Sequence, residues 1–555
     1  MISFLSSVFG FVVLLSIVVF VHELGHFTAG RMLGLGIERF ALGFGRALFK
    51  RTRNGIEYRL NWIPFGGYVK FVGDEPGQPV PDELRAVAFN TAPVYKRAIT
   101  VAAGPMMNVV LAVVLFCLVY LVGQPNPTTL VGNVEPDSPA AKAGLRAGDR
   151  IVAVDGDHVE FWEQLSKRIT ENPGRQLRLL VDRGGKPLAV MVTPNRVTAM
   201  NIFGFDSERG SIGVSQTGPK AWIGVTSANS PAHLAGLRTG DLILTVNGQP
   251  IHFLADLDRV LAAQNSGPLT ITVARGEDNI TAAEPPTSFT AQVPAATDAK
   301  PWSAATLGVE AGEFYVQSVV DGSPAQKAGL QIGDRLLALN GAPVTSWDAF
   351  ATTVRENAGK SLVIDVRRNW QTVRLNATPE KKTDRDLLGK VTSFGRLGLS
   401  PQLLFSAVDT KIERYYNPGK IIVRGLGESW HWTAVTVKGF FYLIIGKAPA
   451  TSLGGPILIA QLAGESARMG WIPFVFFMAV ISLNLAFINL FPIPVLDGGF
   501  LFLLTIEGVR RRPLSDRAVG IAQRVGLTLI GALILLVFYN DLSRVWFDLK
   551  DRFFG

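Results

Sequence analysis

The sequence predicts a multi-pass α-helical membrane protein that carries a tandem of α+β domains in one long loop. Three observations predict this class. Four stretches are apolar over the roughly 20 residues that a helix needs to cross a bilayer. One motif recurs three times between the second stretch and the third. Mean hydropathy is +0.26 and 48% of the residues are hydrophobic, which is high for a protein surrounded by water alone. A chain of 555 residues has room for several domains.

The apolar stretches are predicted to be transmembrane helices. The first lacks both a basic leader and a small-residue cleavage site, so we expect it to be retained rather than removed as a signal peptide. Lys and Arg are concentrated in the loops after the first and third stretches, which predicts that both loops are cytoplasmic and that residues 123–470 and both termini lie outside. The four stretches are Ile2–Phe20, Ile99–Val122, Trp471–Phe491 and Val519–Tyr539.

The net charge of +9 could indicate a nucleic-acid partner. The chain has no zinc-finger, RNP or helix-turn-helix signature, so we expect no nucleic acid and attribute the charge to loops at a membrane surface. The single cysteine, Cys117, cannot form an internal disulfide and lies in an apolar run, where a small core side chain is the simpler interpretation.

The recurring motif reads SPAAKAGLRAGDRIVAVDG from Ser138, SPAHLAGLRTGDLILTVNG from Ser230 and SPAQKAGLQIGDRLLALNG from Ser323, with starts 92 and 93 residues apart. Each copy predicts a short helix, a tight turn and a strand. The Gly-Asp pair in each turn is expected to form the turn rather than to bind a ligand. The motif resembles the bacterial PDZ domain, which implies three such domains, at 130–195, 220–293 and 306–380. PDZ domains add a peptide to a sheet edge, although a size filter or a tether remains an open alternative.

The end of the first apolar stretch carries His22-Glu23-Leu24-Gly25-His26. Histidines four residues apart lie on one helix face, so both can reach one Zn²⁺. Glu23 between them can take a proton from water on the metal. The alternative is a pair of buried histidines in a helix bundle, which leaves an ionisable residue such as Glu23 at membrane depth unexplained.

A catalytic zinc site needs a third protein ligand. The remaining histidines lie in the repeats or before an apolar stretch on the outer side, so none is well placed. Asp497 follows Pro492 and Pro494, which are expected to end the third helix near its cytoplasmic end. Gly498 and Gly499 would allow the backbone to approach closely there. Asp497 is therefore the candidate third ligand.

These motifs resemble the site-2 protease family of intramembrane zinc metalloproteases, and most of all its bacterial sigma-E-pathway members. The resemblance rests on HELGH and NLFPIPVLDGG, with further matches in PFGGYVKF, FNTAPVYKRAITVAAGPMMN and SLGGPILIAQLAG. It covers both ends of the chain and most of the middle. It implies zinc bound by His22, His26 and Asp497, with Glu23 as general base.

The resemblance also implies where a substrate would bind. Asn484 and Asn489 in the third helix would hold it. The segment Arg39–Val72 would be a re-entrant β-loop that pairs with the unwound substrate, with Tyr68, Val69 and Lys70 as edge residues. An amphipathic hairpin lying on the membrane is the alternative. For Asn108 in the second helix, packing and function are left open.

The resulting domain plan places a first helix at 1–38, the β-loop region at 39–97 and a second helix at 98–123. After the repeats come a membrane-proximal amphipathic region at 386–470, a third helix at 471–499 and a fourth at 519–540. Within 386–470, the stretch Thr433–Ile445 is too short and mixed to span, so we expect it to lie at the outer interface.

The resemblance implies an enzyme in the bacterial inner membrane, with its active site toward the cytoplasm and its PDZ domains outside. Implied substrates are single-span proteins already trimmed by another protease, such as an anti-sigma factor in an envelope stress response, or leftover signal peptides. A membrane-anchored PDZ scaffold or chaperone with a structural metal is the alternative, but it has no need of Glu23. A transporter is disfavoured because no inverted repeat of the helices is visible. Two features depart from the family: three PDZ repeats instead of two, and Phe500 where histidine is common.

Overall fold

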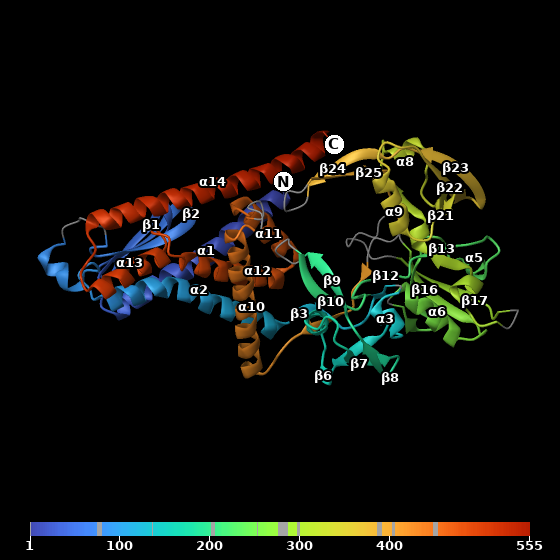
Figure 1. Cartoon of the computed structure of the whole chain (residues 1–555), viewed down its shortest axis with the longest axis horizontal. Helices are drawn as coiled ribbons and strands as arrows, with labels where there is room; N and C mark the ends of the chain where they lie inside the picture. Colours follow the sequence, from blue (N-terminus) through green and yellow to red (C-terminus); the bar gives the residue numbers. More distant parts are fainter. Residues whose placement is uncertain are drawn as a thin grey trace. The chain divides into compact units, whose positions relative to one another are not determined.

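The computed structural model divides into two compact units (Figure 1). Unit 1 comprises Met1–Gln124 and Ile412–Gly555, and unit 2 comprises Pro125–Lys411. The residues that the structure describes are 2–74, 80–135, 137–200, 206–251, 253–275, 287–296, 300–385, 391–401, 406–447 and 453–554.

Unit 1 is built mainly of helices. Four of them are long and apolar enough to cross a membrane over Ser7–Met32, Val94–Val122, Trp471–Asn489 and Arg517–Trp546, in agreement with the four predicted stretches. The first helix continues without a break through the two histidines. The helices are α1 (Ile2–Met32), α2 (Val94–Val122), α10 (Pro418–Ile444), α11 (Pro456–Met469), α12 (Trp471–Asn489), α13 (Asp497–Arg510) and α14 (Asp516–Phe554), with a 3₁₀ helix at Asp82–Val87.

The helices α1, α2, α11 and α12 pack around two small apolar clusters. Leu14 and Val18 of α1 lie against Met478 of α12, and Phe116 of α2 lies against Leu483. A Cβ on Gly25 of α1 would overlap the carbonyl of Ala103 in α2, so this glycine sets how closely the two helices approach. By contrast, only 6% of the apolar window of α14 is buried.

The stretch Thr433–Ile445 was expected to be too short to span, and the helix that contains most of it is not among the described helices that could cross a membrane. The stretch is the second half of α10, a helix of 27 residues. Figure 1 shows α10 running across the direction of α2 and α12. The first half of α10 contains polar residues such as Arg424 and Glu428. The apolar pattern of the sequence therefore indicated only the second half of the helix. Glu428 accepts hydrogen bonds from the Tyr120 hydroxyl of α2 and from the Trp432 indole N–H of α10 itself, so these polar residues are used in packing.

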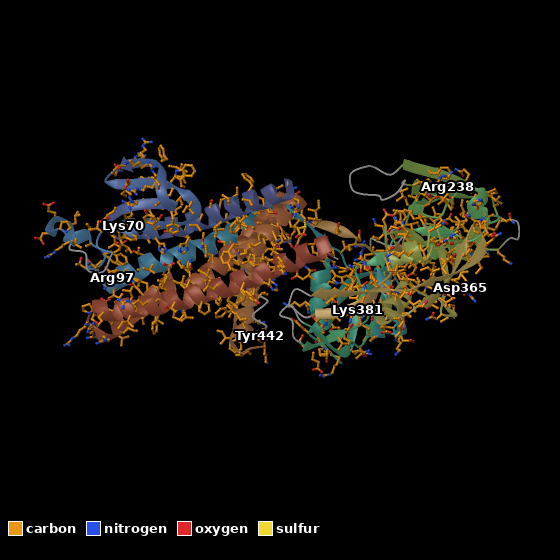
Figure 2. The ribbon with its side chains drawn as sticks, turned by 90° about the horizontal axis from the view of Figure 1, so that it is seen from above. Lys70, Arg97, Arg238, Asp365, Lys381 and Tyr442 are labelled. Atoms are coloured by element: carbon orange, nitrogen blue, oxygen red, sulfur yellow. The ribbon has the colours of Figure 1, made fainter. Side chains whose placement is uncertain are left out.

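A β-meander connects α1 to α2. It consists of β1 (Ile37–Arg53) and β2 (Ile56–Phe71), which are antiparallel. The first half of β1 pairs with both halves of β2, since Phe40 is opposite both Tyr58 and Val69. Among the pairings between described residues, the last segment of β2, residues 67–71, has a partner on one side only. The end of β2 is therefore an edge strand. Figure 2 labels Lys70 of this segment and Arg97 near the start of α2.

Unit 2 contains three four-stranded sheets with equivalent orders, β6-β5-β7-β8, β15-β14-β16-β17 and β21-β20-β22-β23. Each sheet encloses its own apolar core with two helices, and Leu307 of α7 (Ala304–Leu307) also belongs to the second core. The sheet strands are β5 (Arg150–Val154), β6 (Asp157–His158), β7 (Leu177–Arg183), β8 (Lys186–Val192), β14 (Leu242–Val246), β15 (Gln249–Pro250), β16 (Leu269–Arg275), β17 (Thr287–Val293), β20 (Arg335–Leu339), β21 (Ala342–Pro343), β22 (Leu362–Arg368) and β23 (Gln371–Ala377). The helices are α3 (Pro139–Lys142), α4 (Trp162–Thr170), α5 (Pro231–Leu234), α6 (Leu254–Ala263), α8 (Pro324–Lys327) and α9 (Trp347–Glu356).

Each repeat is closed by a strand that the predicted bounds exclude. The first copy is β11 (Val214–Ser215), which pairs with β4 (Asn133–Val134). The second is β18 (Val309–Ala311), paired with β13 (Ile223–Val225), and the third is β26 (Leu399–Pro401), paired with β19 (Val316–Val319). Residues 306–311 therefore belong to the second repeat and not to the third, which corrects the predicted boundary. The shared signal is Ile/Leu-Gly-Val/Leu, which is too short to recognise alone.

The Gly-Asp pairs form turns, as predicted, and also anchor an arginine. Asp149 accepts the backbone N–H of Arg146 at 2.8 Å and both ends of the Arg183 guanidinium at 2.7 Å. Asp241 with Arg275 and Asp334 with Arg368 repeat this arrangement, with 34 residues between partners each time. The separation of 34 residues between the aspartate and the arginine is the same in all three repeats.

The remaining elements of the described chain connect these sheets. They are β3 (Gln124–Pro127), β9 (Asn195–Met200), β10 (Asp206–Ser211), β12 (Gly218–Pro219), α7 (Ala304–Leu307), a 3₁₀ helix at Gly312–Phe314, β24 (Glu380–Arg385), β25 (Val391–Arg396), β27 (Ser406–Ala407) and β28 (Thr410–Glu413).

Candidate metal centre

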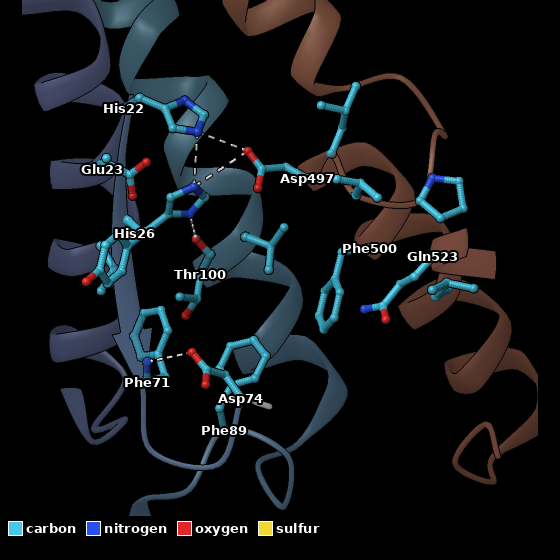
Figure 3. Close-up of a pocket in the computed structure, with 18 residues that line it drawn as sticks. His22, Glu23, His26, Phe71, Asp74, Phe89, Thr100, Asp497, Phe500 and Gln523 are labelled. Atoms are coloured by element: carbon cyan, nitrogen blue, oxygen red, sulfur yellow. Dashed lines mark hydrogen bonds and ion pairs between the residues drawn. The ribbon is translucent and has the colours of Figure 1, made fainter. Parts of the chain in front are cut away.

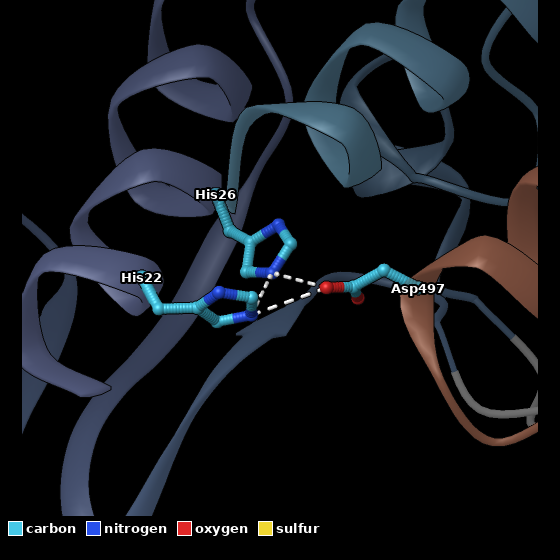
Figure 4. A group of neighbouring side chains, drawn as sticks. All are labelled: His22, His26 and Asp497. Atoms are coloured by element: carbon cyan, nitrogen blue, oxygen red, sulfur yellow. Dashed lines mark hydrogen bonds and ion pairs between the residues drawn. The ribbon is translucent and has the colours of Figure 1, made fainter. Parts of the chain in front are cut away.

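His22, His26 and Asp497 meet within unit 1, although 471 positions separate the second from the third (Figure 4). The two histidines lie one turn apart on α1, and their Nε2 atoms are 3.2 Å from each other. Oδ2 of Asp497 lies 3.1 Å from Nε2 of His22 and 3.5 Å from Nε2 of His26. The sequence reasoning expected this grouping, and the structure brings the three side chains together.

The position of Asp497 follows from the break after α12. That helix ends at Asn489, and α13 begins at Asp497 itself. A Cβ on Gly498 or Gly499 would overlap the carbonyl oxygen of Leu490 or Ile493, so both glycines are needed for this tight reversal. The close approach expected of the two glycines is thus present.

The helix that begins with Asp497 is also fixed at its far end. The guanidinium of Arg97 at the start of α2 donates two hydrogen bonds to the carboxylate of Glu507, at 2.5 and 3.2 Å. Both side chains are at most 15% exposed. A two-bonded Arg–carboxylate pair fixes orientation as well as distance, so Arg97 holds α13 against α2.

The three side chains fit a zinc ion. Oδ2 of Asp497 is buried and makes no hydrogen bond of good geometry, although two imidazole nitrogens face it. Such an orphan acceptor is costly unless a cation satisfies it. Four ligands placed tetrahedrally about 2.0–2.2 Å from zinc lie roughly 3.3–3.6 Å from one another. The observed separations of 3.1, 3.2 and 3.5 Å are close to this triangle.

The second nitrogen of each imidazole is held by α2. Nδ1 of His26 lies 2.9 Å from the backbone oxygen of Thr100, which fixes a proton on Nδ1 and leaves Nε2 as the lone-pair atom. Nδ1 of His22 lies 3.3 Å from the side-chain amide of Asn108, a residue with no exposed surface. A Cβ on Gly104 would overlap Nε2 of His26, so α2 touches the imidazoles directly.

Glu23 lies beside the three residues and the edge of β2. It is 9% exposed. A Cβ on Gly67 would lie 2.9 Å from Cγ of Glu23, so this glycine lets β2 approach the carboxylate. Glu23, Gly67, Tyr68 and Val69 line one cavity with the two histidines and Asp497 (Figure 3).

The predicted substrate-binding residues take up different positions. Nδ2 of Asn489 lies 3.5 Å from Nε2 of His22, next to the candidate metal centre. Asn484 instead accepts a hydrogen bond of 2.6 Å from the Thr436 hydroxyl of α10. Tyr68 and Val69 line the cavity, whereas the Lys70 ammonium lies 3.6 Å from the carboxylate of Glu38 in β1.

Several contributors to the centre were missed in the sequence. Thr100, Gly104 and Arg97 lie within the quoted stretch FNTAPVYKRAITVAAGPMMN, yet nothing in one sequence shows which of them faces the histidines. Asn108 was noticed, but packing and function were left open, and its contact with His22 now favours function. The pairing of Arg97 with Glu507 spans 410 positions and leaves no local pattern.

Comparisons with known proteins identify the family of the chain. The model of peptidase family M50 matches residues 10–533. The chain is 32% identical to the regulator of sigma-E protease RseP of Salmonella typhimurium strain 14028s over 546 residues, covering 98% of this chain and 100% of the relative. RseP of Escherichia coli K12 is similar to the same extent. Among solved structures, the PDZ domain of an SdrC-like protein from Listeria innocua matches 16% of this chain and 91% of its own, with 25% identity and a TM-score of 0.13.

The match extends over nearly the whole chain, and it includes the helices that bear the two histidines and Asp497. Members of this family depend on zinc and cleave peptide bonds within membranes. The chain therefore belongs to peptidase family M50 and is an intramembrane zinc metalloprotease of the site-2 type.

Proposed function

We propose that His22, His26 and Asp497 hold the zinc ion and that Glu23 is the general base of an endopeptidase that cuts transmembrane segments of single-span proteins. The observation that carries the proposal is the buried, unsatisfied Oδ2 of Asp497 opposite two imidazole Nε2 atoms. Zinc in such a site lowers the pKa of a water molecule and polarises the scissile carbonyl.

The roles of the protein groups follow from their places. Glu23 lies on the cavity wall beside the histidines, where it can take a proton from the attacking water and pass it to the leaving amine. A proton carrier of this kind has no use in a purely structural metal site. Glu23 therefore favours the enzyme over a scaffold.

The substrate is proposed to bind as an added strand. Peptide bonds within a helix are shielded, so a transmembrane helix has to unwind before hydrolysis, and its free N–H and C=O groups then need partners. Residues 67–69 of β2 offer an edge with a partner strand on one side among the described pairings, whereas the N–H of Phe71 donates to Asp74. The edge at residues 67–69 borders Glu23. Tyr68 and Val69 supply the edge at the cavity. The Lys70 side chain is proposed to support it through Glu38.

The proposed orientation places the centre toward the cytoplasm and unit 2 outside. It is supported by the concentration of Lys and Arg in the loops after the first and third spans. The three PDZ-like repeats of unit 2 would then meet the outer part of a substrate. They would exclude proteins with bulky external domains or bind a newly exposed C-terminus.

The named relatives regulate sigma-E. By analogy we propose single-span substrates of the anti-sigma type, already trimmed outside by another protease, in the inner membrane of a bacterium. Remnant signal peptides are a second group with the same chemistry, since each is a short apolar helix without an external domain.

The test is cleavage of a tagged single-span peptide without an outer domain by the purified full-length protein in liposomes. Wild type, Glu23→Gln and the exposed control Glu83→Gln are compared, with bound zinc measured in each. We expect wild type and Glu83→Gln to cleave, and Glu23→Gln to retain zinc but lose activity. Equal cleavage by Glu23→Gln would overturn the assigned role. Zinc content unchanged by Asp497→Ala would overturn the ligand set.

A further inference from the structure

A cavity of about 330 Å³ extends from the candidate metal centre, and its two ends differ in chemistry (Figure 3). One end carries the histidines, Glu23 and Asp497. The walls beyond them are mainly apolar, with Asp74 and Gln523 as polar members, and the apolar side chains come from three separate elements. These apolar side chains are Phe71, Phe89, Val101, Phe500 and Leu503.

Three phenylalanines form one continuous wall of this apolar end. The rings of Phe71 and Phe89 are stacked, with centroids 5.3 Å apart, and those of Phe89 and Phe500 are 5.9 Å apart. Phe71 ends the β2 edge strand, Phe89 precedes α2, and Phe500 lies on α13. The backbone N–H of Phe89 donates to the oxygen of Val72 at 2.8 Å, which ties the loop before α2 to the end of β2.

The same elements carry the candidate metal centre and the aromatic wall. Phe500 follows Asp497 by three positions on α13, so the two side chains lie on neighbouring positions of one helix face. Val101 is adjacent to Thr100, whose backbone oxygen holds His26. Phe71 is two residues beyond Val69 on the edge strand. A peptide bond placed at the metal centre therefore has the aromatic wall within reach of an adjoining side chain.

We propose that this apolar end is a specificity pocket that takes a bulky apolar side chain next to the scissile bond. The wall of Phe71, Phe89 and Phe500, with Val101 and Leu503, is apolar and offers no positive charge to an acidic side chain. The carboxylate of Asp74, which also lines this end, accepts the backbone N–H of Phe71 at 2.8 Å. Because every transmembrane segment is apolar, the pocket would not choose between membrane proteins in general. It would choose which bond along the unwound segment is cut.

The inference rests on the proposed proteolytic function. The size of the expected effect on cleavage follows from the burial of one side chain. Full burial of a Leu or Phe side chain corresponds to roughly 10- to 100-fold in binding, and loss of part of this contact lowers kcat/KM accordingly. We expect one substrate position beside the cut at which Leu or Phe is cleaved about tenfold or more faster than Ala or Asp.

The experiment uses the full-length protein in liposomes and a tagged single-span peptide whose cleaved bond has been mapped. The three positions on each side of that bond are replaced in turn by Ala, Leu, Phe and Asp. Phe500→Ala enlarges the pocket and should shift the preference toward larger side chains. Leu503→Phe narrows it and should shift the preference toward smaller ones. Phe502→Ala is the matched control, because Phe502 lies on the same helix, is 52% exposed and does not line the cavity.

Bound zinc is measured for every variant, so that an effect on Asp497 is separated from an effect on selectivity. Opposite shifts in Phe500→Ala and Leu503→Phe, with zinc unchanged and Phe502→Ala like wild type, are the expected result. An unchanged profile in both cavity variants, or a loss of rate that is the same for every substrate, overturns the pocket. Absence of cleavage by zinc-loaded wild type would instead contradict the proposed function.

Discussion

The side-chain amide nitrogen of Asn108 lies 3.3 Å from Nδ1 of His22, while the buried Oδ1 of the same amide has no hydrogen-bond partner. Two nitrogens therefore face each other while an acceptor is left over. Turning the amide by 180° resolves this, because Oδ1 then accepts a hydrogen bond from the Nδ1–H of His22 and leaves its Nε2 free for a metal. This orientation matches that of His26, whose Nδ1 faces the backbone oxygen of Thr100.

The contact predicts that Asn108→Ala weakens zinc binding. Loss of such a partner typically costs 10- to 100-fold in metal affinity or activity. Zinc affinity would be measured by competition with a chelator, beside Met106→Ala as the control, since Met106 is 52% exposed on the same helix. Asn108→Asp keeps an acceptor and should retain most of the affinity. Equal affinities in wild type and Asn108→Ala would show that Asn108 serves packing alone.

Gly104 gives a second prediction about the same face of α2. A side chain there would overlap Nε2 of His26, so Gly104→Ala should displace the imidazole and lower both bound zinc and cleavage. Gly427→Ala in α10 meets nothing within 4 Å and should leave both unchanged or stabilise the helix by about 0.5–1 kcal/mol. Zinc content and far-UV circular dichroism distinguish loss of the centre from unfolding. Full zinc content in Gly104→Ala would contradict the close contact.

The buried ion pair in each repeat of unit 2 gives a third prediction. Asp149 is 1% exposed, so Arg183→Ala would leave a buried carboxylate with fewer donors, at a cost of about 1–3 kcal/mol to the local stability of the first repeat. Hydrogen exchange of the full-length protein would show faster exchange over β5 and β7. Arg178→Ala, on the exposed face of β7, is the control. The same rate of hydrogen exchange in both variants would mean that the Asp149–Arg183 pair does not stabilise the first repeat.

Glu310 makes the contact between the second and third repeats dependent on pH. Burial alone would raise the pKa of Glu310, but hydrogen bonds from Arg335 and Tyr315 outweigh it and bring the pKa below its usual value. A lowered pKa means that the ionised form stabilises the fold above the unfolded pKa of about 4.3 and that this contribution is lost as the pH falls through the folded pKa.

Glu310→Gln should therefore cost about 1–3 kcal/mol near pH 7 and much less near pH 3. Denaturant unfolding followed by tryptophan fluorescence at both values measures this difference. Glu313→Gln, two residues beyond β18, gives a comparison. A cost that is the same at both pH values would show that folding does not lower the pKa of Glu310.

What the sequence could predict depended on the range of the underlying signal. His22, Glu23 and His26 lie within one helical turn and a known spacing, so their shared face follows from helix geometry. Asp497 was found by elimination and resemblance together. Arg97 with Glu507, and Asn108 with His22, depend on how distant helices pack, and one sequence carries no pattern for that. The closing strand at Val309 was missed because two or three residues are too few to show a period.

Asn484 and Asn489 were predicted as a pair, and their different partners predict different effects. Asn489 lies 3.5 Å from Nε2 of His22, so Asn489→Ala should alter zinc affinity as well as cleavage. Asn484 accepts from Thr436 of α10, so Asn484→Ala should leave zinc unchanged and raise KM by loosening α10 from α12. One hydrogen bond is worth about 0.5–1.5 kcal/mol, or roughly 2- to 12-fold. Thr436→Val removes the donor but keeps the shape. If it reproduces the KM effect of Asn484→Ala, that effect comes through α10; a normal KM in Thr436→Val would instead mean that Asn484 contacts the substrate directly.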